Sequence, residues 1–240
     1  MFDALFTTTT EYQKLSHALS GKGACALFGL PASGRAQVYA ALCRQLDKPL
    51  CIVTPGEAEA TRFAADLNTL GIPAAVFPAR EYVLRPIEGT AREYEYRRLA
   101  VLGELVGGRL RAVAVPAEAL TQFTTPKEDL CANTRTLHAG DTLLRDDLLA
   151  ALFGAGYTRR AQVDGPGQFS VRGDIVDIFA PDQKMPVRME FWGDEIDTLH
   201  TFDLTTQRRE DAIDKFYLSP AREVLFGKPA DAAEQLRAFL

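Results

Sequence analysis

The chain has 240 residues, of which 47% are hydrophobic and 25% are charged, a composition typical of globular proteins. It excludes collagen, coiled coils and wholesale disorder, and the length allows one large domain or two small ones. With 27 Lys and Arg against 32 Asp and Glu, the formal net charge of −5 argues against a dedicated nucleic-acid scaffold, although it leaves room for a local basic patch.

The sequence also lacks the usual signals for membranes, secretion and metals. No apolar run approaches the roughly 18 residues of a membrane span, and the first residues lack the basic and apolar regions of a signal peptide. Cys25, Cys43, Cys51 and Cys131 show no C-x-x-C pairing, and the three histidines are scattered. We therefore expect a cytoplasmic monomer with reduced thiols, no metal site and no cofactor.

Helix and strand patterns alternate along the first half of the chain. Thr8 and Glu11 predict a capping box at the start of the first helix. Short apolar runs at 24–28, 50–53, 74–77 and 112–115 predict strands, and helical patterns follow at 35–46, 56–70 and 93–105. This alternation predicts βαβ units and a parallel sheet, as in P-loop-like α/β domains.

The loop after the first predicted strand carries the two glycines of a phosphate-binding loop, Gly29 and Gly34, with Ser33 between them. A working loop, G-x-x-x-x-G-K-[ST], needs the lysine for phosphate and the hydroxyl for Mg²⁺. Arg35 and Ala36 occupy those two positions, and neither supplies the same chemistry. We predict a degenerate nucleotide site that keeps its fold without ATP. The alternatives are a weak anion site at the helix N-terminus and a working ATPase.

The pattern changes after about residue 126. One more helix is predicted near residues 144–153, and from Tyr157 onward the apolar period becomes two, as in strands with one buried face. Gly193-Asp194 predicts a type II′ hairpin, and a change of phase near Gly173 predicts a bulge. The predicted organisation is an α/β domain at 1–126, an inserted, mostly antiparallel β-rich domain at 127–212 and a return segment toward the first domain at 213–240, all cut from a longer protein.

The most informative stretch begins at Gly156 and extends to Arg208. It contains G-Y-x-R, P-G-x-F-x-V-R-G-x-I-x-D-I-F, P-V-R-x-E-F-x-G-D-E-I-D and F-D-x-x-T-Q-R in this order. These elements resemble the UvrA-interaction domain that UvrB and the bacterial transcription-repair coupling factor (Mfd) share. Arg35, Ala36 and the lack of a tyrosine run in 78–98 favour the N-terminal, UvrB-like module of the coupling factor over UvrB itself.

The resemblance implies a non-catalytic module that binds UvrA and recruits it to lesions marked by stalled RNA polymerase. Matched to the motif, the UvrA-binding role falls on Arg159, Arg172 and Phe179, with Phe169 as a neighbouring aromatic. RNA polymerase and DNA would be contacted by other parts of a parent protein that is an ATP-dependent DNA translocase.

Plainer roles remain open for several of these residues. Arg160 could be a solvated charge, Phe179 a core residue and Asp177 a structural partner of Arg172. Two other functions also remain open. One is an ATP-dependent, UvrB-type damage-verification helicase. The other is direct DNA binding through 80–111, where seven Arg stand against five Glu, although such a stretch is usually a solvated helix face.

Overall fold

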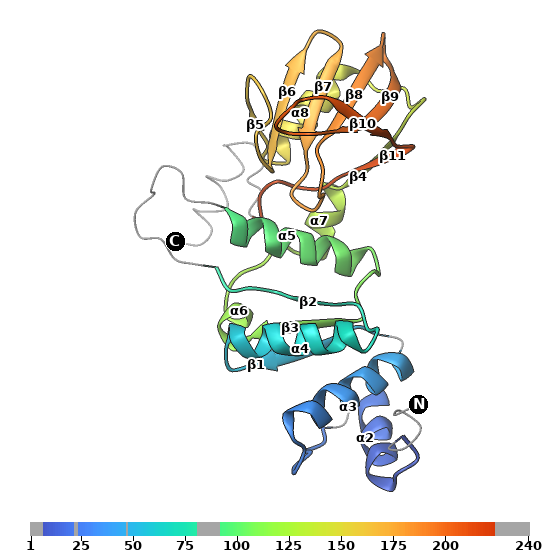
Figure 1. Ribbon diagram of the computed structural model, residues 1–240, viewed down its shortest axis with the longest axis vertical. Coiled ribbons are helices and arrows are strands. Elements are labelled where there is room, and N and C mark those ends of the chain that lie inside the picture. The colour runs from blue at the N-terminus through green and yellow to red at the C-terminus, as the bar shows by residue number, and fades with distance from the viewer. Residues whose placement is uncertain (1–6, 22–23, 47, 81–91, 224–240) are drawn as a thin grey trace. The chain divides into compact units, whose positions relative to one another are not determined.

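The computed structural model describes residues 7–21, 24–46, 48–80 and 92–223 (Figure 1). Its contacts divide the chain into two compact units. The first unit comprises residues 1–80 and 107–122, and the second comprises 81–106 and 123–240. The segment 93–106 belongs with the second unit.

The first unit is a small α/β structure, as the alternating pattern predicts. Its parallel sheet has the strand order β1-β3-β2. Alanines of α3 and α4, with Phe63 and Leu67, pack against the inward side chains of the sheet. The elements are α2 (Thr10–Ser20), α3 (Ala32–Gln45), β1 (Leu50–Thr54), α4 (Glu57–Thr69), β2 (Ala74–Val76), β3 (Ala112–Pro116) and α6 (Ala117–Leu120).

The start of α2 and the end of α4 show how local hydrogen bonds set the bounds of a helix. The N-cap of α2 is Thr9, whose hydroxyl accepts a hydrogen bond from the Tyr12 N–H, so the predicted capping box at Thr8 is wrong by one residue. The end of α4 follows the prediction. Gly71 has φ +75° and its N–H bonds to Asn68 O, while the N–H of Ile72 bonds to Leu67 O, the two bonds of a Schellman motif.

The predicted strand at 24–28 does not form. Among the described residues, no strand pairs with this run, its side chains are exposed, and Phe28 is 88% exposed. Helix α3 begins at Ala32, directly after Pro31, so Ser33 and Gly34 lie in its first turn. An apolar run becomes a strand only where a neighbouring strand satisfies its backbone groups, so the strand-to-helix context of a P-loop is not confirmed here.

The second unit is dominated by a six-stranded sheet with the order β10-β9-β8-β7-β6-β5 (Figure 1). Only β5 runs parallel to its neighbour, so the predicted antiparallel character is confirmed. The described part of the predicted return segment, up to Glu223, belongs to this unit, where β11 pairs with β4. The elements are α5 (Glu93–Val106), α7 (Lys127–Ala132), β4 (Arg135–His138), α8 (Arg145–Gly154), β5 (Thr158–Arg159), β6 (Gln168–Arg172), β7 (Ile175–Phe179), β8 (Val187–Trp192), β9 (Glu195–Phe202), β10 (Arg209–Ala212) and β11 (Lys215–Leu218).

Two tight hairpins order the centre of this sheet. Gly193-Asp194 joins β8 to β9, and φ is positive (+64°) only at the glycine, as a type II′ turn requires. Gly173-Asp174 joins β6 to β7 in continuous register, so the predicted bulge near Gly173 is wrong: the change of phase marks a turn. The irregularity lies instead between Glu190 and Phe191, where the β8–β9 register shifts.

One face of the six-stranded sheet forms the hydrophobic core of the unit. Phe169, Ile178 and Met189 project to this face and are fully buried with Leu148 and Leu152 of α8. Because successive side chains of a strand alternate between faces, the residues between them on β6, β7 and β8 project to the opposite side.

A fully buried ion pair joins α5 to the end of the described chain. The Arg98 guanidinium donates to both carboxylate oxygens of Glu223 at 2.8 Å, and both side chains are 0% exposed. Thr124 and Thr125 also donate to Glu223, and the Glu223 N–H donates to Glu95. Arg98 therefore does not belong to the solvated helix face that the arginine-rich stretch suggested.

We predict that Glu223→Ala destabilises the second unit by about 3–5 kcal/mol, because it leaves the Arg98 charge buried without its carboxylate. Urea unfolding measures this. Asp174→Ala is the matched control: that side chain is 77% exposed and pairs with Arg145 at the surface, so its removal should cost less than about 1 kcal/mol. Equal costs for the two variants would contradict the structural role of the buried pair.

Candidate protein-binding site

The face of the sheet opposite the main core carries a row of polar side chains beside a small apolar cluster of Val163, Phe179 and Phe202. Cross-strand pairing places Ser170 beside Asp177 and Asp177 beside Arg188, so these three side chains form a row across β6, β7 and β8. We call this surface the polar face. It comprises Ser170, Arg172, Asp177, Arg188, Glu190 and Trp192.

Asp177 is the centre of the polar face. Its side chain is 0% exposed, and a carboxylate so buried requires paired charge and hydrogen bonds. Arg188 binds both of its oxygens, with Nε at 2.7 Å from Oδ1 and Nη2 at 3.0 Å from Oδ2. Arg172 reaches Oδ2 at 2.5 Å, and the Ser170 hydroxyl lies 3.5 Å from the same atom. One buried carboxylate thus holds two arginines in fixed positions.

Arg188 is held from two further directions. Its guanidinium lies 4.8 Å from the centre of the Phe202 ring, and its Nη1 donates to Gln207 O at 3.3 Å. Gln207 has φ +58°, a left-handed conformation that is uncommon outside glycine. The preceding turn is closed by Asp203, which accepts the N–H groups of Thr205 and Thr206, and the hydrogen bonds from Thr206 lower the pKa of Asp203.

The rim of the polar face is more open than its centre. The Arg172 side chain is 46% exposed, whereas that of Arg188 is only 12% exposed. Glu190 pairs with Arg209 of β10 and accepts from Thr198 of β9. Trp192 is 82% exposed at the end of β8. The surface therefore presents an oriented guanidinium and a large exposed aromatic ring on a rigid sheet, which is the usual material of protein-binding hot spots.

The structure separates the four residues predicted for UvrA binding. Arg172 lies on the polar face, and its pairing with Asp177 confirms the structural role that the sequence left open. Arg159 is exposed on the edge strand β5, as is Arg160 just after it. Phe169 and Phe179 are 0% and 7% exposed and pack in the two cores of the sheet, so neither ring is on the surface.

Sequence reasoning missed Arg188, although it stands in the P-V-R-x-E-F element. The signal was the alternation of charged and apolar residues along β8, which places Arg188 and Glu190 opposite the core. The F-D-x-x-T-Q-R element likewise contains Asp203 and Gln207, which build the turn behind Arg188. Parity within the strand assigns Arg188, Glu190 and Trp192 to one face, but the pairing of Arg188 with Asp177 also requires the register between strands.

The predicted nucleotide loop shows a different arrangement from a phosphate cradle. Arg35 lies 3.5 Å from the Glu59 carboxylate and 5.7 Å from the centre of the Phe63 ring. Ala36 is buried in the hydrophobic core of the first unit. Gly29 has φ +82° in the exposed segment before α3. The Arg35 side chain is thus engaged with α4.

Within the part of the chain that the structure describes, no group of three or more His, Cys, Asp or Glu side chains could hold a metal ion. None of the described helices is long and apolar enough to span a membrane.

Comparison with known proteins agrees with this geometry. Residues 136–224, which carry the polar face, match the family model of the UvrB interaction domain. This part of the chain is a UvrB interaction domain. The whole chain is also similar to transcription-repair-coupling factors: it is 36% identical to that of Mycobacterium bovis over 98% of its length, 35% identical to that of Myxococcus xanthus over 82%, and 28% identical to that of Bacillus subtilis over 88%.

The matches confirm the resemblance predicted from the motifs, which is to the N-terminal, UvrB-like module of the coupling factor. The chain spans about a fifth of the length of these relatives: 20%, 17% and 18% of the three proteins. The UvrB interaction domain is thus one part of a chain that is itself similar to only a portion of each relative.

We predict that the two arginines of the polar face differ in their effect on stability. Arg188→Ala should destabilise the second unit by about 2–4 kcal/mol, because Asp177 then loses the partner that binds both of its oxygens. Arg172→Ala should cost less than about 1 kcal/mol, because that side chain is largely solvated and Arg188 remains. Chemical denaturation of both variants checks the order, and a larger loss for Arg172→Ala would contradict it.

Proposed function

We propose that the UvrB interaction domain of this chain binds UvrA through the polar face, together with Arg159 at the neighbouring edge of the sheet. The observation that supports this most strongly is the Arg172–Asp177–Arg188 network within the matched family domain, which orients the half-exposed Arg172 side chain on the face opposite the main core. In a transcription-repair-coupling factor, such a module would recruit UvrA to lesions at which RNA polymerase has stalled.

The geometry suits recognition of an acidic partner surface. Arg172 gives one nitrogen to Asp177, and its exposed remainder can form charge-assisted bonds with a partner carboxylate. Because Asp177 already fixes the side chain, binding would cost little of its conformational entropy. Trp192 adds apolar area on the same face without exposing a flexible chain.

The two phenylalanines receive a supporting role in this proposal. Phe169 packs in the core under β6, with the Phe153 ring 5.2 Å away, and Phe179 packs with Val163 and Phe202. The Arg188 guanidinium also lies over the face of the Phe202 ring. We propose that both phenylalanines position the strands and arginines of the polar face, rather than touch the partner directly.

The first unit is proposed to be non-catalytic. A P-loop ATPase needs a lysine and a hydroxyl at the positions of Arg35 and Ala36, and the Arg35 side chain here lies against Glu59 and Phe63. We place the translocase activity, and the contacts with RNA polymerase and DNA that accompany it, in other parts of a longer parent protein. The module would meet UvrA as a monomer in the cytoplasm.

Titration of the chain against UvrA tests the proposed partner. Arg172→Ala should weaken binding at least about 30-fold, since loss of an interfacial arginine costs about 2–5 kcal/mol and each 1.4 kcal/mol is tenfold. Arg159→Ala should also weaken binding to UvrA. Arg135→Ala is the matched control, because Arg135 is exposed on β4 in a separate two-stranded sheet.

The outcomes separate the partner from the site. If the unaltered chain shows no binding at tens of micromolar UvrA, the proposed function fails. If the chain binds but Arg172→Ala and Arg135→Ala behave alike, the polar face is not the contact surface.

Binding of a fluorescent ATP analogue tests whether the first unit lacks a working nucleotide site. We expect no Mg²⁺-dependent binding in the micromolar range, because Ala36 provides no oxygen for the metal. An intact P-loop ATPase serves as the positive control. Micromolar binding that requires Mg²⁺ would overturn this part of the proposal.

A further inference from the structure

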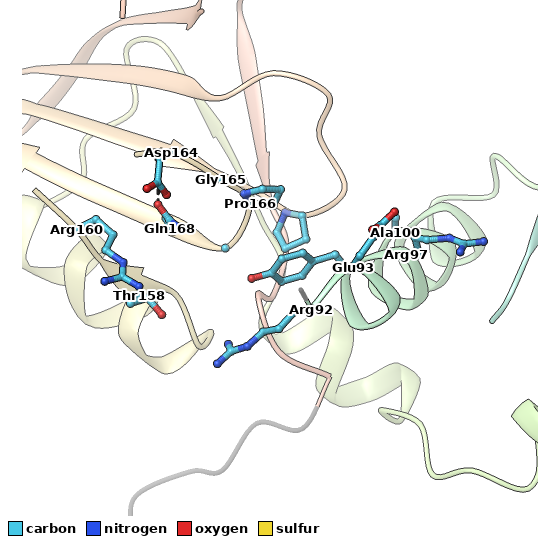
Figure 2. A pocket seen from close by; sticks show the side chains of 13 residues that line it. Arg92, Glu93, Arg97, Ala100, Thr158, Arg160, Asp164, Gly165, Pro166 and Gln168 are labelled. Carbon is cyan, nitrogen blue, oxygen red and sulfur yellow. Dashed lines mark hydrogen bonds between the residues drawn. The ribbon is translucent and has the colours of Figure 1, made fainter. Parts of the chain in front are cut away.

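A cleft of about 710 Å³ lies within the second unit (Figure 2), and its lining does not include Arg172, Asp177 or Arg188. Its walls are the start of α5 on one side and strand β5 with the loop into β6 on the other. Three arginines line it, Arg92, Arg97 and Arg160, against two acids, Glu93 and Asp164. The proposed UvrA contact uses none of these side chains.

Two of the arginines converge on one region of the cleft. Figure 2 shows the guanidinium groups of Arg92 and Arg160 directed toward the space beside Thr158, while Arg97 points away from it. Thr158 and Arg160 both line the cleft, so Arg159 between them projects elsewhere, as alternation along a strand requires. The Glu93 carboxylate points away from this space, whereas the Asp164 carboxylate lies beside Gln168.

The wall of the cleft is fixed by a close approach of Tyr96 to the backbone. Gly167 has φ +73°, and a Cβ built on it would lie 2.6 Å from the Tyr96 hydroxyl, so only glycine fits. The positive charge of Arg92 lies close enough to Tyr96 to oppose part of the effect of burial on the pKa of that phenol. Burial raises the pKa of Tyr96, so the phenol stays protonated at neutral pH. Pro166 and Pro181 complete a stiff, partly apolar lining.

We propose that this cleft binds the phosphate of a nucleotide, either free or within single-stranded nucleic acid. A phosphate offers several charged acceptor oxygens, enough for two guanidinium groups and the Thr158 hydroxyl, whereas a carboxylate offers two. The Tyr96 ring and the two prolines provide apolar surface for the attached sugar and base. The volume lies within the range of small-molecule sites.

Fluorescence anisotropy of the 240-residue chain with a short labelled oligothymidylate tests the proposal, and inorganic pyrophosphate serves as the free phosphate ligand. Arg92→Ala and Arg160→Ala should each weaken binding about fivefold or more. Each should also lower the slope of log K against log salt by about 0.7 for the oligonucleotide, the value for one lost contact with a single strand. Arg97→Ala is the matched control, since Arg97 lines the same cleft and points away.

Each outcome of these binding experiments either supports or overturns the proposed phosphate site. Oligonucleotide binding that needs Arg92 and Arg160 supports a nucleic-acid ligand, and pyrophosphate binding with the same dependence and no oligonucleotide binding supports a free one. Failure of both probes at millimolar concentration overturns the proposal. Equal losses in all three variants, or binding of polyglutamate with the same arginine dependence and higher affinity, overturn it as well. Circular dichroism of each variant confirms that the fold is intact.

Discussion

The second unit depends on a carboxylate that cannot be solvated. Asp177 stands on the central strand β7 with its side chain fully buried, so its charge must be balanced by the protein. Two arginines on the flanking strands provide that balance, and in doing so they become fixed in direction. Arg188 lies low against Phe202, while Arg172 reaches the same carboxylate from the rim and stays half solvated. A structural requirement thereby produces an oriented, half-exposed positive charge on the polar face.

The support behind this surface extends through the rest of the unit. The Asp203 turn holds Gln207 in its left-handed conformation and brings Gln207 O to Arg188. A second buried pair, Arg98 with Glu223, fastens α5 to the segment that follows β11. Both networks place charge where hydrophobic side chains would be simpler to bury. Such pairs contribute specificity of arrangement more than net stability, because desolvation offsets most of the attraction. Here the Asp177 network fixes the direction of Arg172, and the Arg98–Glu223 pair joins α5 to the segment after β11.

Much of this could be read from the sequence. Alternation with period two identified the β-rich half, and collinear motifs identified the family of residues 136–224 before any contact was known. Local patterns failed where tertiary contacts decide. Residues 24–28 are apolar enough for a strand but have no neighbouring strand among the described residues, and Gly173 marks a turn because β6 and β7 pair in register. Phe169 is buried under α8 on one face of the sheet, and Phe179 is buried beside Phe202 on the other. Neither packing contact can be read from the sequence.

The most direct test of the polar face as a docking surface is site-specific photo-crosslinking to UvrA. A photoreactive residue in place of Trp192, which is 82% exposed on the polar face, should crosslink to UvrA in a reaction that Arg172→Ala suppresses. The same residue in place of Ala150, exposed on α8 across the core, should give no crosslink. Crosslinking from Ala150 but not from Trp192 would contradict the account.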